Sequence, residues 1–320
     1  MPARAHFSRG KYRNRYSVSG HGPSWEFLKF LWRMRTVSAS GSQLPEQKPD
    51  VAWLKANRSD SALTWVGHST FLLQAHGLNL ITDPHLTARA SPLRHAGPKR
   101  FNQPALDFAD LPPLDIALVS HNHYDHLDER TVKRLAREHA GLTYLVPMGL
   151  KRWFARRGIK RVVELDLWQS AEVNGVRVHC VPVQHFSGRS ATDRNKTLWC
   201  GFVVEMRGRK IFFAGDTGYS ADFRDIGAKF APMDLSLIPI GAYDPRAFMQ
   251  PVHVNPEEAV KIHQDVGSRL SVAMHWGTFR LTLEPLDEPP RKLAQALKAA
   301  GVPAAQFIVM QHGETLKMAL

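Results

Sequence analysis

The chain has 320 residues and 36.0 kDa, with 43% hydrophobic and 22% charged residues, which is enough apolar material for a full globular core. No stretch is apolar enough to span a bilayer, the N-terminus lacks the apolar region of a secretory signal, and two cysteines make no disulfide scaffold. These features favour the cytoplasm, while a net charge of +13 and a pI near 10.0 call for an anionic partner or surface, such as the inner face of a membrane.

The basic charge is concentrated at the N-terminus, where residues 1–36 hold eight lysines and arginines against Glu26 alone. Residues 1–22 are polar and aperiodic, and this predicts a disordered arm. From Trp25 to Arg35 the apolar residues recur at helical spacing, which predicts a short basic amphipathic helix. That helix either lies on an anionic membrane or docks on the domain or on a second subunit. Residues 37–60 predict a linker, so that residues 1–60 form an extension to a domain over 61–320.

From residue 61 onward, strands and helices follow one another closely. The first half predicts strands at 62–66, 71–75, 78–82, 115–120 and 143–146, a long loop over 84–113, and helices at 128–139 and 149–157. The second half predicts strands at 176–183, 197–206, 210–214, 235–239, 270–275, 306–310 and 315–318, and helices at 221–229, 256–266 and 290–300. Both halves start with strands and continue with strand–helix units. This pattern predicts two similar halves, with two mixed sheets inside and helices outside.

A histidine-rich segment directly follows the strand predicted at 115–120 and reads His121-Asn-His123-Tyr-Asp125-His126-Leu-Asp128. His121 and His123 are two residues apart at the end of a strand and therefore project to the same side. The following turn can fold Asp125 and His126 back beside them. Imidazole and carboxylate groups are the ligands that zinc accepts when thiolates are absent. The segment predicts a metal site, and the alternative is the start of a helix capped by Asp128.

Three more polar residues follow apolar strands: His185, Asp216 and His275. Ligands gather at strand ends in open sheets. Any one of these residues, taken alone, is typical of a turn or of the core. Together with the histidine-rich segment they predict a second metal position.

The motifs H-N-H-Y-D-H-L-D at 121–128, Q-H at 184–185, A-G-D-T-G-Y at 214–219 and H-W-G-T-F at 275–279 resemble the metallo-β-lactamase superfamily. Residues 96–101, 241–249 and 251–259 resemble its branch of N-acyl-phosphatidylethanolamine-hydrolysing phospholipases D and their bacterial relatives. The resemblance covers residues 61–310. It implies an α/β catalytic domain over 61–320 with the four-layer αββα sandwich fold. Asp244 and Ala247 depart from the Glu and Trp that are usual in the branch.

The resemblance also implies a binuclear zinc centre, with iron or manganese as alternatives. It assigns one zinc to His121, His123, His185 and Asp216, and the other to Asp125, His126, His275 and the shared Asp216. His253 would lie beside the metals and touch the substrate phosphate. The implied activity is that of a phospholipase D-type phosphodiesterase, with Asp216, His253 and Asp125 as catalytic residues.

Other roles rest on the residues themselves. Asp83 ends a predicted strand and either accepts a hydrogen bond from a ligand histidine or serves as a turn residue before Pro84. Tyr124 and Tyr243 either line the cavity and bind substrate or pack in the core.

Competing functions with the same metals are a lactonase and a nuclease, and a binding module without catalysis is a further alternative. The core shows no aromatic and basic platform of the kind that binds nucleic acid. The partners expected are therefore a phospholipid or another phosphodiester substrate and an anionic membrane contacted through residues 1–36. A homodimer is compatible with the linker, which would let the N-terminal helix reach a second subunit.

Overall fold

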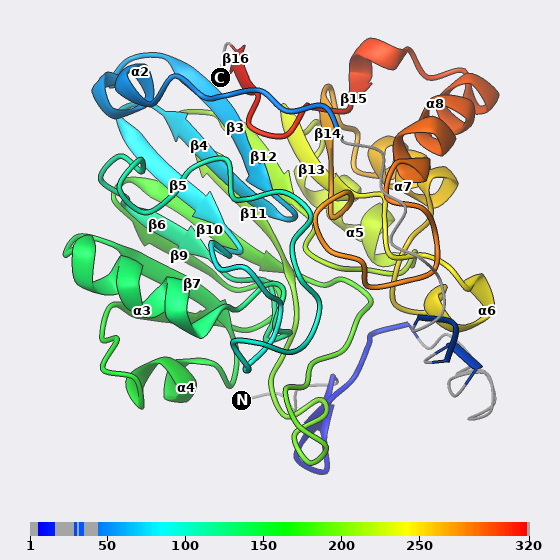
Figure 1. The fold of residues 1–320 in the computed structure, drawn as a ribbon, viewed down its shortest axis with the longest axis horizontal. Coiled ribbons are helices and arrows are strands. Elements are labelled where there is room, and N and C mark those ends of the chain that lie inside the picture. Colours follow the sequence, from blue (N-terminus) through cyan, green and yellow to red (C-terminus); the bar gives the residue numbers. More distant parts are fainter. Residues whose placement is uncertain (1–5, 17–28, 31, 35–43, 319–320) are drawn as a thin grey trace.

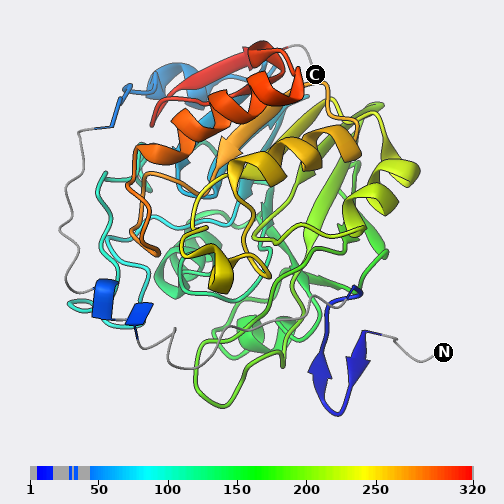
Figure 2. The same ribbon diagram turned by 90° about the vertical axis from the view of Figure 1, so that its right-hand side faces the viewer.

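Two seven-stranded sheets face each other at the centre of the molecule, as the computed structural model shows (Figure 1). The structure describes residues 6–16, 29–30, 32–34 and 44–318. Helices cover the outer faces of both sheets, which gives the layers helix, sheet, sheet, helix (Figure 1). In Figure 2, helices of the second half lie in front of the sheets. The predicted four-layer αββα sandwich is confirmed.

The first sheet has the order β16-β3-β4-β5-β6-β7-β8. Its strands are β16 (Thr315–Met318), β3 (Ser61–Gly67), β4 (Thr70–Ala75), β5 (Leu78–Thr82), β6 (Ile116–Leu118), β7 (Thr143–Pro147) and β8 (Val162–Leu165). The pairs from β16 to β5 are antiparallel, and those from β5 to β8 are parallel. The sheet is therefore mixed, as predicted.

The second sheet has the order β15-β14-β13-β12-β11-β10-β9. Its strands are β15 (Phe307–Ile308), β14 (Ser271–Met274), β13 (Leu235–Pro239), β12 (Arg209–Phe213), β11 (Gly201–Met206), β10 (Val176–Val181) and β9 (Ser170–Val173). The pairs from β9 to β12 are antiparallel and those from β12 to β15 parallel, which repeats the pattern of the first sheet. The two halves are thus alike in topology, except that the last strand, β16, crosses to the sheet of the first half.

The helices divide between the two outer faces. Those of the first half are α2 (Val51–Ala56), α3 (Glu129–Glu138) and α4 (Lys151–Ala155), and those of the second are α5 (Asp222–Phe230), α6 (Arg246–Met249), α7 (Pro256–Asp265), α8 (Glu288–Ala300) and the 3-10 turn η1 (Ala304–Gln306). Leu135 of α3 and Phe154 of α4 are fully buried in one apolar cluster against the first sheet. The larger cluster fills the space between the sheets and extends beneath α5, α7 and α8. Burial of these apolar faces holds the layers together.

Several short elements were not predicted from the sequence. Strands β8 and β9 lie at an edge of their sheets, helix α6 has four residues, and helix α2 interrupts the predicted linker over 37–60. Asp50 caps α2 by accepting a hydrogen bond from the backbone of Trp53 at 2.9 Å, a local signal that the prolines nearby obscured.

Residues 6–16 pack on the domain. Residues 6–16 form a hairpin of β1 (Phe7–Ser8) and β2 (Lys11–Tyr12), in which Tyr12 is 4% exposed and belongs to the main apolar cluster. The prediction of a disordered arm is therefore wrong for residues 6–16, because Tyr12 of this polar segment is buried in the core. Its remaining residues, 1–5 and 17–22, lie outside the described residues.

The predicted amphipathic helix is described only at residues 29–30 and 32–34, which are helical. Phe30 is buried against Met249 and Leu283, with its ring 5.9 Å from that of Phe248, whereas Trp32 is 67% exposed. Of the alternatives considered, docking on the domain is the one that the structure shows.

Among the described residues, no helix combines the length and apolar character that a membrane span requires.

Candidate metal centre

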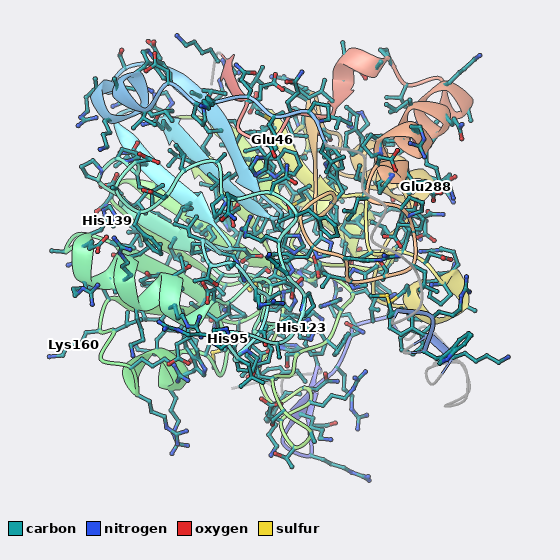
Figure 3. The ribbon with its side chains drawn as sticks, in the orientation of Figure 1. Glu46, His95, His123, His139, Lys160 and Glu288 are labelled. Atoms are coloured by element: carbon teal, nitrogen blue, oxygen red, sulfur yellow. The ribbon has the colours of Figure 1, made fainter. Side chains whose placement is uncertain are left out.

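The predicted metal ligands come together at one edge of the sandwich because the strands before them run in the same direction. His121 follows β6, His185 follows β10, Asp216 follows β12 and His275 follows β14. Gly215 lets two of these strand ends approach each other, since a Cβ there would lie 2.7 Å from Cβ of Ser120. The long segment between β6 and α3 carries the remaining ligands of the histidine-rich motif. Figure 3 labels His123, which lies below the strands of the two large sheets in that view.

One cluster consists of His121, His123 and His185. Nδ1 of His123 lies 2.8 Å from Nε2 of His121 and 3.2 Å from Nε2 of His185. Burial lowers the pKa of all three imidazoles, that of His123 to about 4. Three neutral imidazoles with converging ring nitrogens form one face of a metal site.

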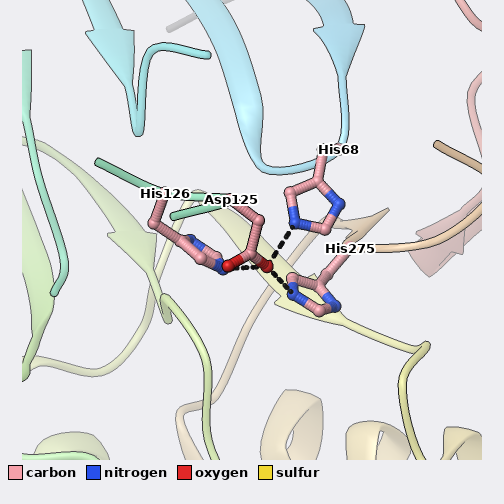
Figure 4. Close-up of side chains that lie close together, drawn as sticks. All are labelled: His68, Asp125, His126 and His275. Atoms are coloured by element: carbon pink, nitrogen blue, oxygen red, sulfur yellow. Dashed lines mark hydrogen bonds and ion pairs between the residues drawn. The ribbon is translucent and has the colours of Figure 1, made fainter. Parts of the chain in front are cut away.

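A second cluster consists of His68, Asp125, His126 and His275 (Figure 4). Oδ2 of Asp125 lies 3.0 Å from Nε2 of His68, 3.2 Å from Nε2 of His126 and 3.4 Å from Nε2 of His275. Burial by itself would raise the pKa of the Asp125 carboxyl. The neighbouring His126 and His275 have the larger, opposite effect, so the pKa lies well below its usual range. The carboxylate is therefore charged, and buried charged groups are paired with other charges or coordinate metal ions.

Asp216 lies between the two clusters. Its Oδ2 is 3.0 Å from Nε2 of His126 and 3.1 Å from Nε2 of His275 in the second cluster. On the other side it is 3.9 Å from Nε2 of His121 and 3.8 Å from Nε2 of His185. A single carboxylate thus reaches both groups of imidazoles, as a bridging ligand does.

The donor atoms fit metal ions better than they fit one another. Nε2 of His126, Nε2 of His275 and Oδ1 of Asp216 are buried and have no hydrogen-bond partner among the described residues, despite the short distances between the groups. Buried polar atoms without partners are rare in native proteins, and each calls for an explanation. Imidazole and carboxylate ligands whose free electron pairs converge on one space are typical of divalent transition-metal sites.

A layer of hydrogen bonds orients the histidines from behind. Nδ1 of His126 donates to Oδ2 of Asp83 at 2.6 Å, and Nδ1 of His185 donates to the carbonyl of Val252 at 2.8 Å. Oγ of Ser120 donates to Asp83 at 2.6 Å and lies 2.9 Å from Nδ1 of His121. Each contact holds one ring nitrogen and leaves Nε2 for the metal.

His253 reaches the same space from the segment before α7. Asn255 caps α7 and forms a capping box with Glu258, while Arg246 donates to the His253 carbonyl at 2.8 Å. Nδ1 of His253 lies 3.9 Å from Oδ2 of Asp216, and burial lowers the pKa of this imidazole to about 4. The side chains of His253 and Asp125 are 14% and 13% exposed, whereas that of Asp216 is 2% exposed. The centre therefore opens to solvent at His253 and Asp125.

The hydroxyls of Tyr124 and Tyr243, the two tyrosines considered for substrate binding, have different partners. The Tyr124 hydroxyl donates to the carbonyl of Arg189 at 3.0 Å, and the Arg189 guanidinium stacks on the Tyr124 ring at 3.9 Å. The Tyr243 hydroxyl donates to Glu288 of α8 at 2.6 Å, and Figure 3 shows Glu288 well apart from His123. The hydroxyl of Tyr243 is therefore directed to Glu288 of α8.

His68 is a residue of the centre that sequence reasoning missed. It follows Gly67 at the end of β3, a strand that runs in the same direction as β5 and β6. The signal was present, because His68 is a polar residue directly after an apolar strand, as are His121, Asp216 and His275.

Comparison with known proteins places the chain in a family. Residues 79–276 match the model described as "Beta-lactamase superfamily domain". The chain is 42% identical to "N-acyl-phosphatidylethanolamine-hydrolyzing phospholipase D 1" of Caenorhabditis elegans over 270 residues, which cover 80% of this chain and 76% of that protein. The protein belongs to the metallo-β-lactamase superfamily and is a metal-dependent hydrolase of that fold.

Two further comparisons support this assignment. The chain is 38% identical to the mitochondrial N-acyl-phosphatidylethanolamine-hydrolyzing phospholipase D of Saccharomyces cerevisiae, over 74% of this chain and 52% of that protein. Among solved structures, Igni18, a metallo hydrolase of Ignicoccus hospitalis, superposes with a TM-score of 0.62 at 21% identity, over 82% of this chain and 100% of that chain. At that identity the superposition shows the fold alone.

Proposed function

We propose that this protein is a binuclear, zinc-dependent phosphodiesterase of phospholipase D type. It would hydrolyse N-acyl-phosphatidylethanolamine, or a related phospholipid, to phosphatidic acid and an N-acylethanolamine. The observation that carries the proposal is the position of Asp216, whose Oδ2 lies within 3.9 Å of ring nitrogens in both clusters. The names of the nematode and yeast relatives give the substrate class.

The residues would hold the metals as two sites that share one carboxylate. His121, His123 and His185 would hold one ion, and Asp125, His126 and His275 the other, with Asp216 between them. When bound there, two zinc ions would supply a hydroxide nucleophile at neutral pH and would neutralise charge on the phosphoryl oxygens. Asp83, Ser120 and the Val252 carbonyl keep the imidazoles in the required orientation.

His253 is the group best placed to meet the phosphate, because it lies at the open side of the centre. With a pKa of about 4 its imidazole is neutral near pH 7. A neutral imidazole donates one N–H hydrogen bond, so His253 would bind a phosphoryl oxygen and orient the phosphorus towards Asp216. The reaction consumes one water, breaks the bond between phosphorus and the ethanolamine oxygen, and leaves that oxygen protonated in the released alcohol.

The surface beside the centre suits an anionic substrate. A cavity of roughly 580 Å³ borders Tyr124, the residue between the ligands His123 and Asp125. Its lining includes two carboxylates, those of Asp128 and Glu129, and seven cationic side chains: Arg94, Arg130, Lys133, Arg134, Arg137, Arg157 and Arg189. Such an excess of positive charge attracts phosphates and anionic lipid surfaces.

The test is an assay of purified, metal-counted protein on vesicles that contain N-acyl-phosphatidylethanolamine. Wild type and a control variant at exposed Asp60, Asp60→Asn, should release phosphatidic acid and N-acylethanolamine, and Asp216→Asn should release neither. Wild type that carries two metals without cleaving the lipid would reject the lipid substrate and leave lactones and soluble phosphodiesters to test.

A further inference from the structure

The N-terminal hairpin contacts the backbone of a proposed metal ligand. Nδ2 of Asn14 donates to the carbonyl of His185 at 3.1 Å, and the N–H of His185 donates to Oδ1 of Asn14 at 3.1 Å. The same Oδ1 accepts a hydrogen bond from Nε1 of Trp199 at 2.9 Å. The Asn14 side chain therefore pairs with His185 as a neighbouring strand would, across 171 positions of sequence.

His185 needs this partner because it lies in an irregular segment between β10 and β11. The residue is 1% exposed, and outside a sheet its backbone N–H and carbonyl have no regular partner. Buried backbone groups are nearly always paired in native proteins. Asn14 supplies both hydrogen bonds, and the Val252 carbonyl holds the ring of His185 through Nδ1. Backbone and ring are thus both fixed, and Nε2 points to His123 and Asp216.

The hairpin is itself fixed at several points around the centre. The backbone N–H of Tyr12 donates to the carbonyl of Asn195, which lies in the same irregular segment as His185, at 2.8 Å. Arg15 forms ion pairs with Asp222 at 2.8 Å and Asp225 at 2.9 Å, at the start of the helix that follows the Asp216 segment. Residues 6–16 therefore join the segment that carries His185 to helix α5, which follows the segment of Asp216.

We propose that residues 6–16 are a supporting part of the metal centre and that Asn14 is a positioning residue for His185. The inference rests on the proposed binuclear site. Metal sites tolerate only small displacements of their ligands, so a shift of the His185 backbone weakens the site that uses His185. The other site, built from Asp125, His126 and His275, has no ligand that Asn14 touches. Loss of the Asn14 amide should therefore weaken one metal position and spare the other.

The experiment titrates metal-free protein with Zn²⁺ against a chromophoric chelator. It compares wild type, Asn14→Ala, Asn14→Ser and the control Lys11→Ala, which changes an exposed side chain of the same hairpin. We expect two zinc equivalents in every protein. One of the two affinities should be roughly 10- to 100-fold weaker in the Asn14 variants, the usual effect of losing a supporting contact. The melting temperature of the metal-free Asn14 variants should lie below that of the control, because two buried backbone groups of His185 lose their partners.

The serine side chain in Asn14→Ser is too short for its hydroxyl to reach both backbone groups of His185, so this variant tests the same contact if Asn14→Ala does not fold. Two affinities equal to those of Lys11→Ala would overturn the inference. An equal loss of affinity at both sites would also overturn it, because Asn14 would then support the fold in general and not the site of His185. Wild type that takes up no zinc would overturn the metal centre itself, and the inference with it.

Discussion

Oδ2 of Asp83 lies 2.6 Å from Nδ1 of His126, and both side chains are fully buried. Asp83 is surrounded by donors, because the N–H and Oγ of Ser120 donate to its two oxygens at 2.7 Å and 2.6 Å. Burial raises the pKa of the Asp83 carboxyl above its usual range, against the effect of His126. The carboxyl group thus joins the start of the histidine-rich motif to the end of β5.

Asp83→Asn should weaken metal binding by roughly 10- to 100-fold. The amide replaces one acceptor oxygen with an NH₂ group, which would face the N–H or hydroxyl donors of Ser120 and His126 and would no longer orient the imidazole. The unpaired group should also lower the free energy of unfolding by about 1–3 kcal/mol. Zinc titration and urea unfolding measure the two effects. Asp115→Asn is the matched control, since Asp115 also accepts a backbone hydrogen bond, from Asn79 at 2.8 Å, beside the same sheet. Equal metal affinity of the two variants would refute the supporting role of Asp83.

His68 provides a second test of how the centre is supported. Its φ is +56°, in the left-handed region that asparagine tolerates better than most residues. His68→Asn therefore removes the contact with Asp125 without straining the backbone, and we expect a roughly tenfold weaker affinity at the site that uses Asp125. His76→Asn is the control, because His76 has a φ of +53° in the turn between β4 and β5. Identical zinc affinities in both variants would show that His68 only fills space.

The proposed ligands that could be predicted from the sequence alone are those whose position follows from neighbouring residues in the chain. His121, His123, Asp125 and His126 are neighbours in the chain, and the strands before His185, Asp216 and His275 are strongly apolar. His68 and Asn14 depend instead on tertiary structure. The direction of β3 relative to β6 decides where His68 lies, and Asn14 reaches His185 only through the docked hairpin.

The buried histidine His85 makes stability depend on pH. Burial lowers the pKa of His85 to about 3, and neither ring nitrogen has a hydrogen-bond partner among the described residues. In the unfolded chain the pKa is near 6.5, so the unfolded state binds a proton that the folded state rejects, and stability is lost as the pH falls below 6.5. At pH 5 this single group costs roughly 2 kcal/mol.

His85→Leu should therefore reduce the difference in unfolding free energy between pH 7 and pH 5 by roughly 2 kcal/mol. Urea unfolding at the two pH values measures the difference. The control is His95→Leu, which changes an exposed histidine of the same loop. In this variant the difference in unfolding free energy between the two pH values should equal that of wild type. If the difference in unfolding free energy between pH 7 and pH 5 is the same in His85→Leu as in wild type, His85 takes up its proton as readily in the folded protein as in the unfolded chain.

Trp32 tests the membrane contact proposed for residues 1–36. Deletion of the whole segment would remove Asn14 together with Trp32, so binding to lipid and support of the metal centre would be lost together. A point variant separates them, because Trp32 is 67% exposed while its neighbour Phe30 holds the helical segment on Met249 and Leu283. An exposed tryptophan on a basic segment suits the headgroup region of an anionic bilayer.

Trp32→Ala should weaken binding to vesicles of anionic lipid by roughly tenfold, the equivalent of about 1.4 kcal/mol, and Trp32→Phe should weaken it less. Hydrolysis of a short-chain soluble substrate should be unchanged, since Phe30 still docks the segment. Binding of all three proteins should weaken at high salt, because screening reduces the attraction between basic residues and anionic headgroups. Vesicle binding of Trp32→Ala equal to that of wild type would show that the protein meets the membrane elsewhere, and the cationic cavity beside Tyr124 would be the surface to vary next.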